Sequence, residues 1–417
     1  MSNYSFFERY LSRLTKFSPF LHYYIKYLYQ SINYLIYRKD YKFKINSLAS
    51  ISESVLNQVS FFGYYDHTPW SNNMKFLILN VVKDSTLLLK LFEKTDNRYV
   101  FKKDVITTLV FNYQQGIRAM WLNNKEIIFN CMRDNQLVSS VYNIESDTKK
   151  YFPYPFQEAK GRNIFCLDYN HLDLLNKDYG YDLQKKGYYI KNIDGILAYD
   201  IDSKDLKFHL DKRKIHKLSM IKDNTDNCEI NHINASPFDD AIIFIYRNKG
   251  SNSISELYWF CTKGNNLRRI FSGEIVSHYC WLSANQILVY LGKKVKNQGY
   301  YLIQISGSKS IEIKSQDSMN HNGDGHPSLC PNNRFIVYDS YPDRNRYIHL
   351  NIYDTVSKKA IKVGEFFSPL KYSGFNRCDL HPRWSPDGTC ISIDSCHSGL
   401  RKHYIIEVSN MIKKNMN

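Results

Sequence analysis

The sequence predicts an all-β protein, a seven-bladed β-propeller with an N-terminal helical extension. From Phe61 onward the chain repeats a unit of roughly 40–50 residues, a period typical of propellers and other repeat architectures. The composition, with 15% aromatic residues including 34 Tyr and 24 Phe, suits pleated, half-buried strands better than helices. No Gly/Ser-rich linker interrupts the repeats, so we divide the chain into an extension, residues 1–50, and one propeller domain, residues 51–417.

The extension is basic and aromatic, with eight Lys or Arg residues against two Asp or Glu. Residues 17–37 are long enough to span a bilayer, but Lys26, Gln30 and Asn33 interrupt the apolar run, so we expect a helix that does not span. Its pattern suits either a helix in a membrane interface or one packed against the propeller wall, and both interpretations stay open. Because no secretory signal is present, we expect a cytoplasmic protein, peripheral at the inner membrane face if this helix meets lipid.

Each propeller unit opens on a polar or His-bearing segment, passes a turn such as Ser-Pro-Asp-Gly, and contains β-runs that predict four strands. The seven openings fall at 63–81, 113–130, 161–175, 230–247, 276–292, 323–341 and 378–395. Seven such units close a ring that leaves no free sheet edge. The insert of the third unit, residues 178–196, is expected to form a loop over one face. Residues 51–60 are expected to supply a strand that completes the last blade.

The formal net charge of +16 admits a nucleic-acid partner, but the lysines are scattered and form no basic helix or binding motif. We therefore predict no nucleic-acid partner and favour an anionic glycan or an anionic membrane surface. Nine cysteines lie apart without a Cys-x-x-Cys pair, so neither a disulfide framework nor a thiolate zinc site is predicted. They fit small buried residues of a protein in a reducing compartment.

Polar residues near the start of each unit should converge on one axial pocket, because the innermost strand of each blade lines the central channel. These residues are Asp66, His67, Gln114, Gln115, Arg118, Asp168, His171, Asn231, His232, His278, Asp324, His326, Arg377, Asp379, His381 and Arg383. The four histidines at 232, 278, 326 and 381 recur at equivalent positions of successive units, which predicts a metal site or an acid/base site. Taken singly, each residue also has a structural interpretation, as a turn cap or a tie between blades.

Two further polar groups are expected away from this pocket. His397 and Arg401 follow the first strand of the last unit and are expected in a turn at the opposite rim. Asp339 and Asp343 are expected in a polar cluster at a loop rim, where they either reach a ligand or, as is commoner, solvate the turn.

Several units resemble a known family. INHINASPFDDAIIFIYRNKG (230–250) and GEIVSHYCWLSANQILVYL (273–291) are similar to the middle blades of oligogalacturonate lyases, which are intracellular seven-bladed propellers with TolB/WD40-like repeats. HPSLCPNNRFIVYDSYPD (326–343) and RCDLHPRWSPDGTCISIDS (377–395) are similar to a broader set of bacterial lyase-like propellers. The resemblance spans about residues 60–410.

The resemblance implies an enzyme in which a His abstracts a proton, an Arg neutralises the uronate, and three His and a Gln bind a divalent metal, typically manganese. Matched unit by unit, it implies His232 as the base and His278 as one metal ligand. The family's grouping of a Gln with two His is absent here, and His326 and His381 are assigned to part of that set. From the axial polar residues themselves, the positive charge beside the uronate is assigned to Arg118, Arg377 or Arg383, and the remaining substrate contacts to Asp66, Gln115, Asn231, Asp324 and Asp379.

These observations predict a carbon–oxygen lyase that cleaves a uronate-containing polysaccharide or oligosaccharide by β-elimination, since that reaction needs a base and positive charge beside a carboxylate. One alternative is a non-catalytic glycan-binding or assembly factor in surface-polysaccharide production, supported by the basic aromatic N-terminus. Another is a protein-interaction propeller, because a fold does not fix a function. A lyase forms an unsaturated sugar that absorbs in the near ultraviolet, whereas the other two do not.

Overall fold

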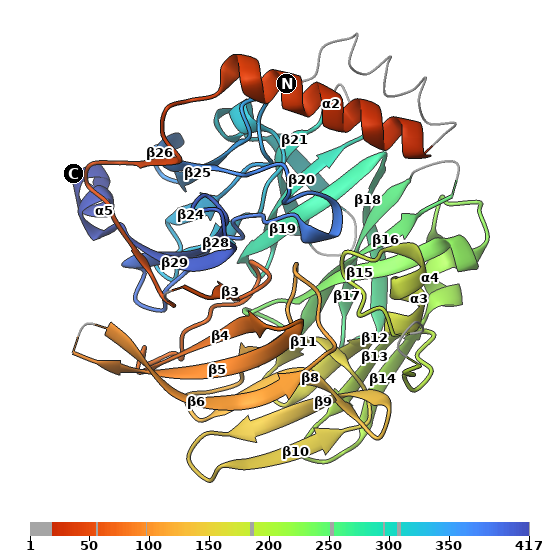
Figure 1. Cartoon of the computed structure of the whole chain (residues 1–417). Coiled ribbons are helices and arrows are strands. Elements are labelled where there is room, and N and C mark those ends of the chain that lie inside the picture. Colours follow the sequence, from red (N-terminus) through yellow and green to blue (C-terminus); the bar gives the residue numbers. More distant parts are fainter. Residues whose placement is uncertain are drawn as a thin grey trace.

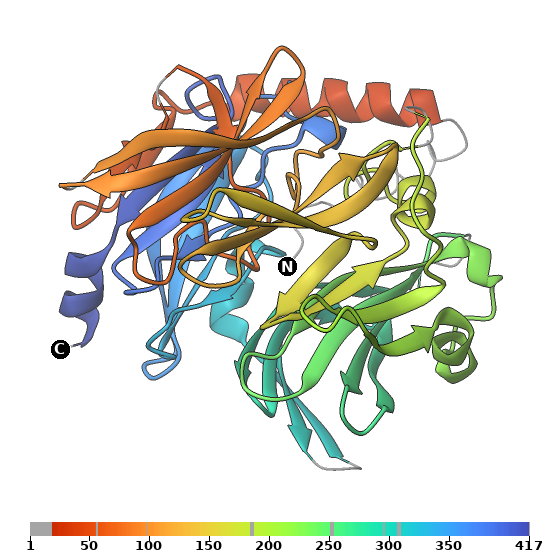
Figure 2. The same cartoon turned by 90° about the horizontal axis from the view of Figure 1, so that it is seen from below.

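The computed structural model describes residues 19–416 except 56, 97, 184–186, 251–253, 295–296 and 307–309. Its strands form seven antiparallel sheets, which stand around a central axis as the blades of a propeller (Figures 1 and 2). The predicted fold class and blade number are confirmed for this part of the chain.

Blades 1 to 4 each contain four strands that follow one another in the sequence. Blade 1 comprises β3 (Val59–Phe61), β4 (Phe76–Lys83), β5 (Thr86–Thr95) and β6 (Arg98–Thr108). Blade 2 comprises β7 (Met120–Trp121), β8 (Glu126–Arg133), β9 (Gln136–Asn143) and β10 (Thr148–Phe152). Blade 3 comprises β11 (Phe156–Lys160), β12 (Asn163–Leu167), β13 (Gly195–Asp200) and β14 (Leu206–Asp211). Blade 4 comprises β15 (Cys228–Ala235), β16 (Ala241–Asn248), β17 (Ser255–Cys261) and β18 (Asn266–Gly273).

Blades 6 and 7 also recruit strands from the N-terminal part of the chain, whereas blade 5 does not. Blade 5 comprises β19 (Ile275–Ser283), β20 (Gln286–Gly292), β21 (Gly299–Ser306) and β22 (Ser310–Ser315). Blade 6 comprises β23 (Ser328–Leu329), β24 (Phe335–Tyr338), β25 (Tyr347–Asp354), β26 (Lys359–Phe367) and β1 (Phe43–Ile45). Blade 7 comprises β27 (Arg383–Trp384), β28 (Cys390–Ser395), β29 (Lys402–Glu407) and β2 (Ser50–Glu53).

The ring is closed by the strand that precedes blade 1. Strand β2 pairs with β29, with Ser50 opposite Glu407 and Glu53 opposite Tyr404, so the predicted strand that completes the last blade is present. Strand β1 pairs with β26 and adds a fifth strand to blade 6. Residues 43–45 fall in the segment predicted as a helical extension, so the sheet structure begins before residue 51.

Apolar side chains fill the spaces between neighbouring blades, which is why inner strands such as β4 and β16 are buried over most of their length. Three tryptophans also tie their blade to the preceding one, because each indole N–H donates a hydrogen bond to a backbone carbonyl there. These bonds run from Trp121 to Pro69 (2.9 Å), from Trp281 to Asn234 (3.4 Å) and from Trp384 to Ser328 (3.1 Å).

Helices lie outside the blade sheets. The described part of the chain has α2 (Pro19–Tyr37), α3 (Tyr169–Leu175), α4 (Lys212–Leu218) and α5 (Ser409–Met416), with 3-10 turns at Thr225–Asn227, Asp317–Asn322 and Gly374–Asn376. Helix α2 lies along the outside of the propeller in both views (Figures 1 and 2). The helix predicted over residues 17–37 is confirmed from Pro19, and residues 17 and 18 lie outside the described residues.

Blade 3 starts earlier than the sequence predicts. Its innermost strand is Phe156–Lys160, and the predicted start at residue 161 is the first hairpin turn. Residues 169–175 form helix α3, because the Asp168 carboxylate caps it by accepting hydrogen bonds from the backbone N–H groups of Asn170 and His171. Asp168 and His171 therefore belong to the insert between β12 and β13, and their predicted place on the innermost strand is wrong.

Candidate functional site

The structure brings the four predicted histidines together at the axis. The ring centroids of His232 and His278 are 5.7 Å apart, those of His278 and His326 are 4.0 Å apart, and those of His326 and His381 are 4.4 Å apart. The Tyr64 ring contacts all four at centroid distances of 5.0–6.4 Å. All five side chains are buried, so the axial cluster is an enclosed, polar and aromatic centre.

His232 and His381 hold an unusual backbone conformation at the start of their blades. Their φ angles are 56° and 45°, and Arg118 in blade 2 has a φ of 54°. Left-handed φ angles are uncommon for residues other than glycine and persist only where the surroundings enforce them. The surroundings here include backbone hydrogen bonds: Asn231 Oδ1 accepts from the His232 N–H (2.7 Å), and Asp339 Oδ2 accepts from the His381 N–H (3.1 Å).

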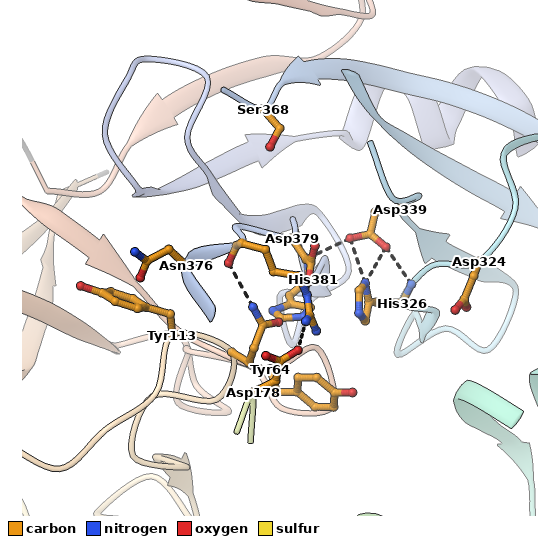
Figure 3. Close-up of polar contacts among 12 residues, drawn as sticks. Tyr64, Tyr113, Asp178, Asp324, His326, Asp339, Ser368, Asn376, Asp379 and His381 are labelled. Atoms are coloured by element: carbon orange, nitrogen blue, oxygen red, sulfur yellow. Dashed lines mark hydrogen bonds and ion pairs between the residues drawn. The ribbon is translucent and has the colours of Figure 1, made fainter. Parts of the chain in front are cut away.

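His326 and His381 are arranged as metal ligands usually are. His326 Nδ1 lies 2.9 Å from Asp339 Oδ1 (Figure 3). His381 Nδ1 lies 2.7 Å from the Gly63 carbonyl oxygen, so each Nδ1 can donate a proton. Both Nε2 atoms are buried without a hydrogen-bond partner. Metal-bound histidines characteristically donate the other ring N–H to a carboxylate or a carbonyl.

A carboxylate completes this group. Donor atoms of His326, Asp379 and His381 lie within 4.8 Å of one another, and all three residues are buried. Two imidazoles and one carboxylate suit a divalent transition metal such as manganese or zinc. The residues therefore fit a divalent ion. His278, which the family resemblance implies as a ligand, lies next to this group, and its Nδ1 faces Asp324 Oδ1 at 3.3 Å.

Charged neighbours set the protonation of the cluster. Burial alone lowers the pKa of His326, but the Asp339 carboxylate outweighs it, so the pKa of His326 is raised. Burial holds the pKa of His232 and of His381 well below the usual value, with like charges on neighbouring groups adding to the effect. Burial alone raises the pKa of Asp379, but Arg377 and His326 lower it overall, which keeps the carboxylate ionised.

His232 has a hydrogen-bonded partner on one nitrogen only. Its Nε2 lies 2.8 Å from the Tyr64 hydroxyl, whereas Nδ1 is buried without a partner. The Tyr179 ring lies 5.0 Å from the imidazole, and the Tyr279 hydroxyl donates to the His232 carbonyl oxygen. A neutral imidazole with one unpaired nitrogen can accept a proton from a bound ligand.

The three predicted arginines have different surroundings. Arg383 is buried against Asp394 (2.7 Å) and donates to the carbonyl oxygens of Gly63 and Tyr64, so it ties blade 7 to blade 1. Arg118 binds both carboxylate oxygens of Asp66, at 3.1 and 3.0 Å. These two guanidinium groups are committed to buried protein carboxylates.

Arg377 lies at the edge of the axial cluster and is partly exposed. Its Nε donates to Asp379 Oδ2 at 2.6 Å, and its Nη1 donates to Asp178 of the blade 3 insert. The two carboxylates hold its pKa well above the usual range, together with Tyr179 and Tyr341. Arg377 is therefore a permanent positive charge beside the metal-ligand group.

The side chains of the other residues predicted to contact the substrate are hydrogen-bonded to groups of the protein, apart from that of Gln115. Asn231 holds the turn before His232, and Asp324 accepts from Ser277 (2.7 Å) beside His278. The Gln115 side-chain amide is buried with neither its oxygen nor its nitrogen hydrogen-bonded. Asp66 is paired with Arg118, as described above.

A second polar group consists of Asp66, His67 and Glu158, whose donor atoms also lie within 4.8 Å of one another. It lines a cavity of about 410 Å³, and Tyr65 separates this cavity from His278 and His326. Burial and the nearby Asp66 charge raise the pKa of Glu158 to about 8, and burial lowers the pKa of His67 to about 4. Because Arg118 already neutralises Asp66, a divalent cation fits this second group less well than the first.

Several residues of the axial cluster were not predicted from the sequence. Asp339 was expected at a loop rim, and that expectation is wrong, because Asp339 is fully buried and holds His326 and His381. A sequence signal that could have placed Asp339 is its Asp-Ser pair, which recurs in the last unit as Asp394 and Ser395. There, Asp394 accepts hydrogen bonds from the backbone N–H groups of Phe62 and Gly63. Tyr179 and Asp178 come from the blade 3 insert, for which the repeat pattern gives no position. Tyr64 lies in the opening of the first unit, where the sequence prediction takes only the polar residues Asp66 and His67 as axial.

Comparisons with known proteins support the fold. No protein-family model matches the sequence, and no curated protein does. An oligogalacturonate lyase from Vibrio parahaemolyticus aligns with a TM-score of 0.58 at 12% identity, over 88% of this chain and 96% of that chain. An oligogalacturonate lyase in complex with manganese aligns with a TM-score of 0.62 at 10% identity, over 89% and 96% of the two chains. At such identities the likeness shows a shared propeller fold.

Proposed function

We propose that this protein is a lyase that cleaves a uronate-containing oligosaccharide or polysaccharide by β-elimination at the axial cluster. The proposal rests on one observation: a base, a set of metal ligands and a positive charge lie together at the axial cluster. His232 offers an unpaired nitrogen as a base, His326, Asp379 and His381 offer ligands for a divalent ion, and Arg377 offers a permanent positive charge. Two solved oligogalacturonate lyases share the fold, and one of them was solved with manganese.

The reaction needs a base and a stabilised anion. A base removes the proton from the carbon next to the uronate carboxylate, the C–H electron pair forms a carbon–carbon double bond, and the glycosidic C–O bond breaks with its electron pair on the leaving oxygen. That oxygen takes up a proton, so the overall reaction consumes no water. In this scheme His232 Nδ1 accepts the first proton, and Arg377 binds the carboxylate as negative charge develops on it.

Manganese is the divalent ion that we propose for His326, Asp379 and His381, with His278 as the further ligand that the family resemblance implies. When bound, a divalent ion supplies positive charge that polarises a carboxylate and makes the neighbouring C–H bond more acidic. The chain's own contribution is to hold His326 and His381 through Asp339 and the Gly63 carbonyl.

The test is a spectrophotometric assay. The full chain is incubated with oligogalacturonates and other uronate oligosaccharides, with manganese or with a chelator, and the near-ultraviolet absorbance of an unsaturated product is followed. The wild type and a His209→Ala control, which changes an exposed histidine of β14, are expected to form the product, and His232→Ala is not. An absorbance that stays flat with every uronate and every divalent ion would overturn the proposal.

A second candidate function is a glycan-binding or assembly factor beside lipid-linked glycans at the inner face of a membrane. The exposed apolar residues of helix α2 favour it, because soluble monomers rarely leave such a stripe uncovered. This function is supported if the protein binds uronate oligosaccharides by calorimetry and yet releases no unsaturated product.

A further inference from the structure

Helix α2 presents an exposed apolar face. Seven of its large apolar side chains are 46–65% exposed: Tyr24, Tyr27, Leu28, Ile32, Leu35, Ile36 and Tyr37. Positions 24, 28, 32 and 35 follow one another at helical spacing, so these side chains form one stripe along the helix.

The opposite side of the same helix is fixed to the propeller. The Tyr34 ring stacks on Phe367 of blade 6 at a centroid distance of 5.2 Å, and Asn33 is buried. Just after the helix, the Lys39 ammonium binds Glu365 at 2.7 Å, and β1 joins the blade 6 sheet. The helix is therefore held in one orientation along the outside of the propeller (Figures 1 and 2). Its apolar stripe is left exposed.

The basic residues of the N-terminal segment favour an anionic partner for this face. Helix α2 contains no Asp or Glu, and residues 1–50 carry eight Lys or Arg against two acids. A second copy of this chain, with a formal net charge of +16, would bring two basic surfaces together, whereas an anionic surface is attracted. Tyrosines with one wet end and one apolar end are typical of the membrane–water interface.

The helix is suited to lying in a bilayer surface rather than crossing it. Among the described residues, no helix combines the length and hydropathy that a transmembrane span requires. An amphipathic helix with basic flanks places its apolar face at the level of the lipid headgroups and upper acyl chains. We propose that the exposed face of helix α2 binds the surface of an anionic lipid bilayer and holds the propeller against it.

The test uses the full chain and two double variants. Leu28→Gln/Leu35→Gln removes apolar area from the stripe, and Leu206→Gln/Val356→Gln is the matched control, because its residues are similarly exposed (56% and 69%) on blades 3 and 6. Circular dichroism confirms that each variant is folded. Cosedimentation is measured with vesicles of pure phosphatidylcholine and with vesicles that also contain phosphatidylglycerol, at low and high salt.

We expect the wild type and the control to sediment with the anionic vesicles at low salt and to be weakened at high salt. The stripe variant should bind those vesicles on the order of tenfold more weakly. Equal binding by stripe variant and control would overturn the proposal, as would equal binding to both kinds of vesicle. It also fails if no form binds vesicles and the wild type is a dimer that the stripe variant converts to a monomer. These results do not depend on lyase activity.

Discussion

At the residue scale, the two ring nitrogens of His326 and of His381 have different surroundings. Nδ1 of His326 and of His381 faces an acceptor of the protein, which fixes the ring, and Nε2 is left without a partner. A buried nitrogen without a hydrogen bond costs free energy, and proteins keep such groups where a ligand uses them. This arrangement predicts different effects for the replacement of Asp339, which holds the proposed ligands, and of His232, the proposed base.

Replacement of Asp339 should weaken metal binding although Asp339 is outside the group of three ligands. Asp339→Asn keeps the size of the side chain but removes the charge that orients His326, and the loss of such a supporting partner lowers metal affinity about 10- to 100-fold. Calorimetric titration with manganese measures the change. Asp202→Asn, at an exposed carboxylate, should leave the affinity unchanged. An Asp339→Asn protein that is folded and binds manganese as well as the wild type would contradict the prediction.

Replacement of the base and of the arginine should have separable effects. His232→Ala is expected to lower kcat by about 10²- to 10⁴-fold while leaving uronate binding largely intact, because it removes proton transfer. Arg377→Ala should instead weaken uronate binding, because the guanidinium binds carboxylates. Steady-state kinetics and calorimetry together measure both quantities. The assignment of roles fails if His232→Ala loses binding and Arg377→Ala loses only kcat.

Sequence reasoning could identify the axial histidines because they recur with the period of the repeat. It could not place Asp339, whose neighbours PDRNR at 342–346 are typical of a solvated turn. It could not place Tyr64 either, since Tyr64 reaches the axis from a loop after β3 rather than from a strand. Gly63 makes that loop possible: its φ of 127° and its close approach to the Gln115 backbone leave no room for a side chain.

At the element scale, the blade 3 insert covers the axial cluster. Tyr179 contacts both Tyr64 and His232, and the Asn112 side chain donates to the Gly180 carbonyl oxygen at 3.1 Å. Asp178 binds Arg377 with a carboxylate, the same group that a uronate offers. The insert was expected over one face of the ring, and its contacts explain why the axial residues are enclosed. Its register could not be predicted, because no repeat of the chain contains a similar segment.

Removal of the Asp178 charge should therefore favour uronate binding. In Asp178→Asn the insert no longer offers Arg377 a competing carboxylate, so we expect a several-fold lower KM for a uronate substrate and little change in kcat. Asp182→Asn, in the same insert, is the control for general loosening of the loop. Weaker uronate binding by Asp178→Asn would show instead that Asp178 positions Arg377 for the substrate.

The link between helix α2 and blade 6 should be sensitive to acid. Burial alone would raise the pKa of Glu365, but hydrogen bonds from Lys362, Lys39 and Tyr41 outweigh it and lower the pKa to about 2 from the usual 4.5. The resulting stability is complete above pH 4.5 and is lost as the pH falls toward 2.

Glu365→Gln should lower the free energy of unfolding at neutral pH by about 1–3 kcal/mol, the usual worth of a hydrogen bond to a charged group. Between pH 4.5 and 2 the difference from the wild type should shrink, because the wild-type carboxylate becomes protonated there. Urea denaturation at a series of pH values measures both effects. A difference that is constant over this pH range would show that the charge of Glu365 contributes nothing.

At the scale of the whole molecule, the ring explains why the fold was predictable and the chemistry less so. Seven similar units each contribute one inner strand, so blade number follows from periodicity alone. Closure through β2 follows as well, since a propeller avoids a free edge by joining its ends. The identity of a ligand depends instead on a few loop residues and on the pairing of arginines. In the sequence, Arg118 and Arg383 are candidates equivalent to Arg377. In the structure, however, Arg118 is bound to Asp66 and Arg383 is bound to Asp394.

We propose that His326, Asp379 and His381, at the axial cluster, bind a divalent metal next to Arg377. The most direct measurement is an anomalous difference map from crystals of the full chain grown with manganese and a uronate oligosaccharide. We expect one manganese peak in contact with Nε2 of His326 and of His381, with a uronate carboxylate at Arg377. A peak at Asp66, His67 and Glu158 instead, or a map without any peak at the axis, would contradict it.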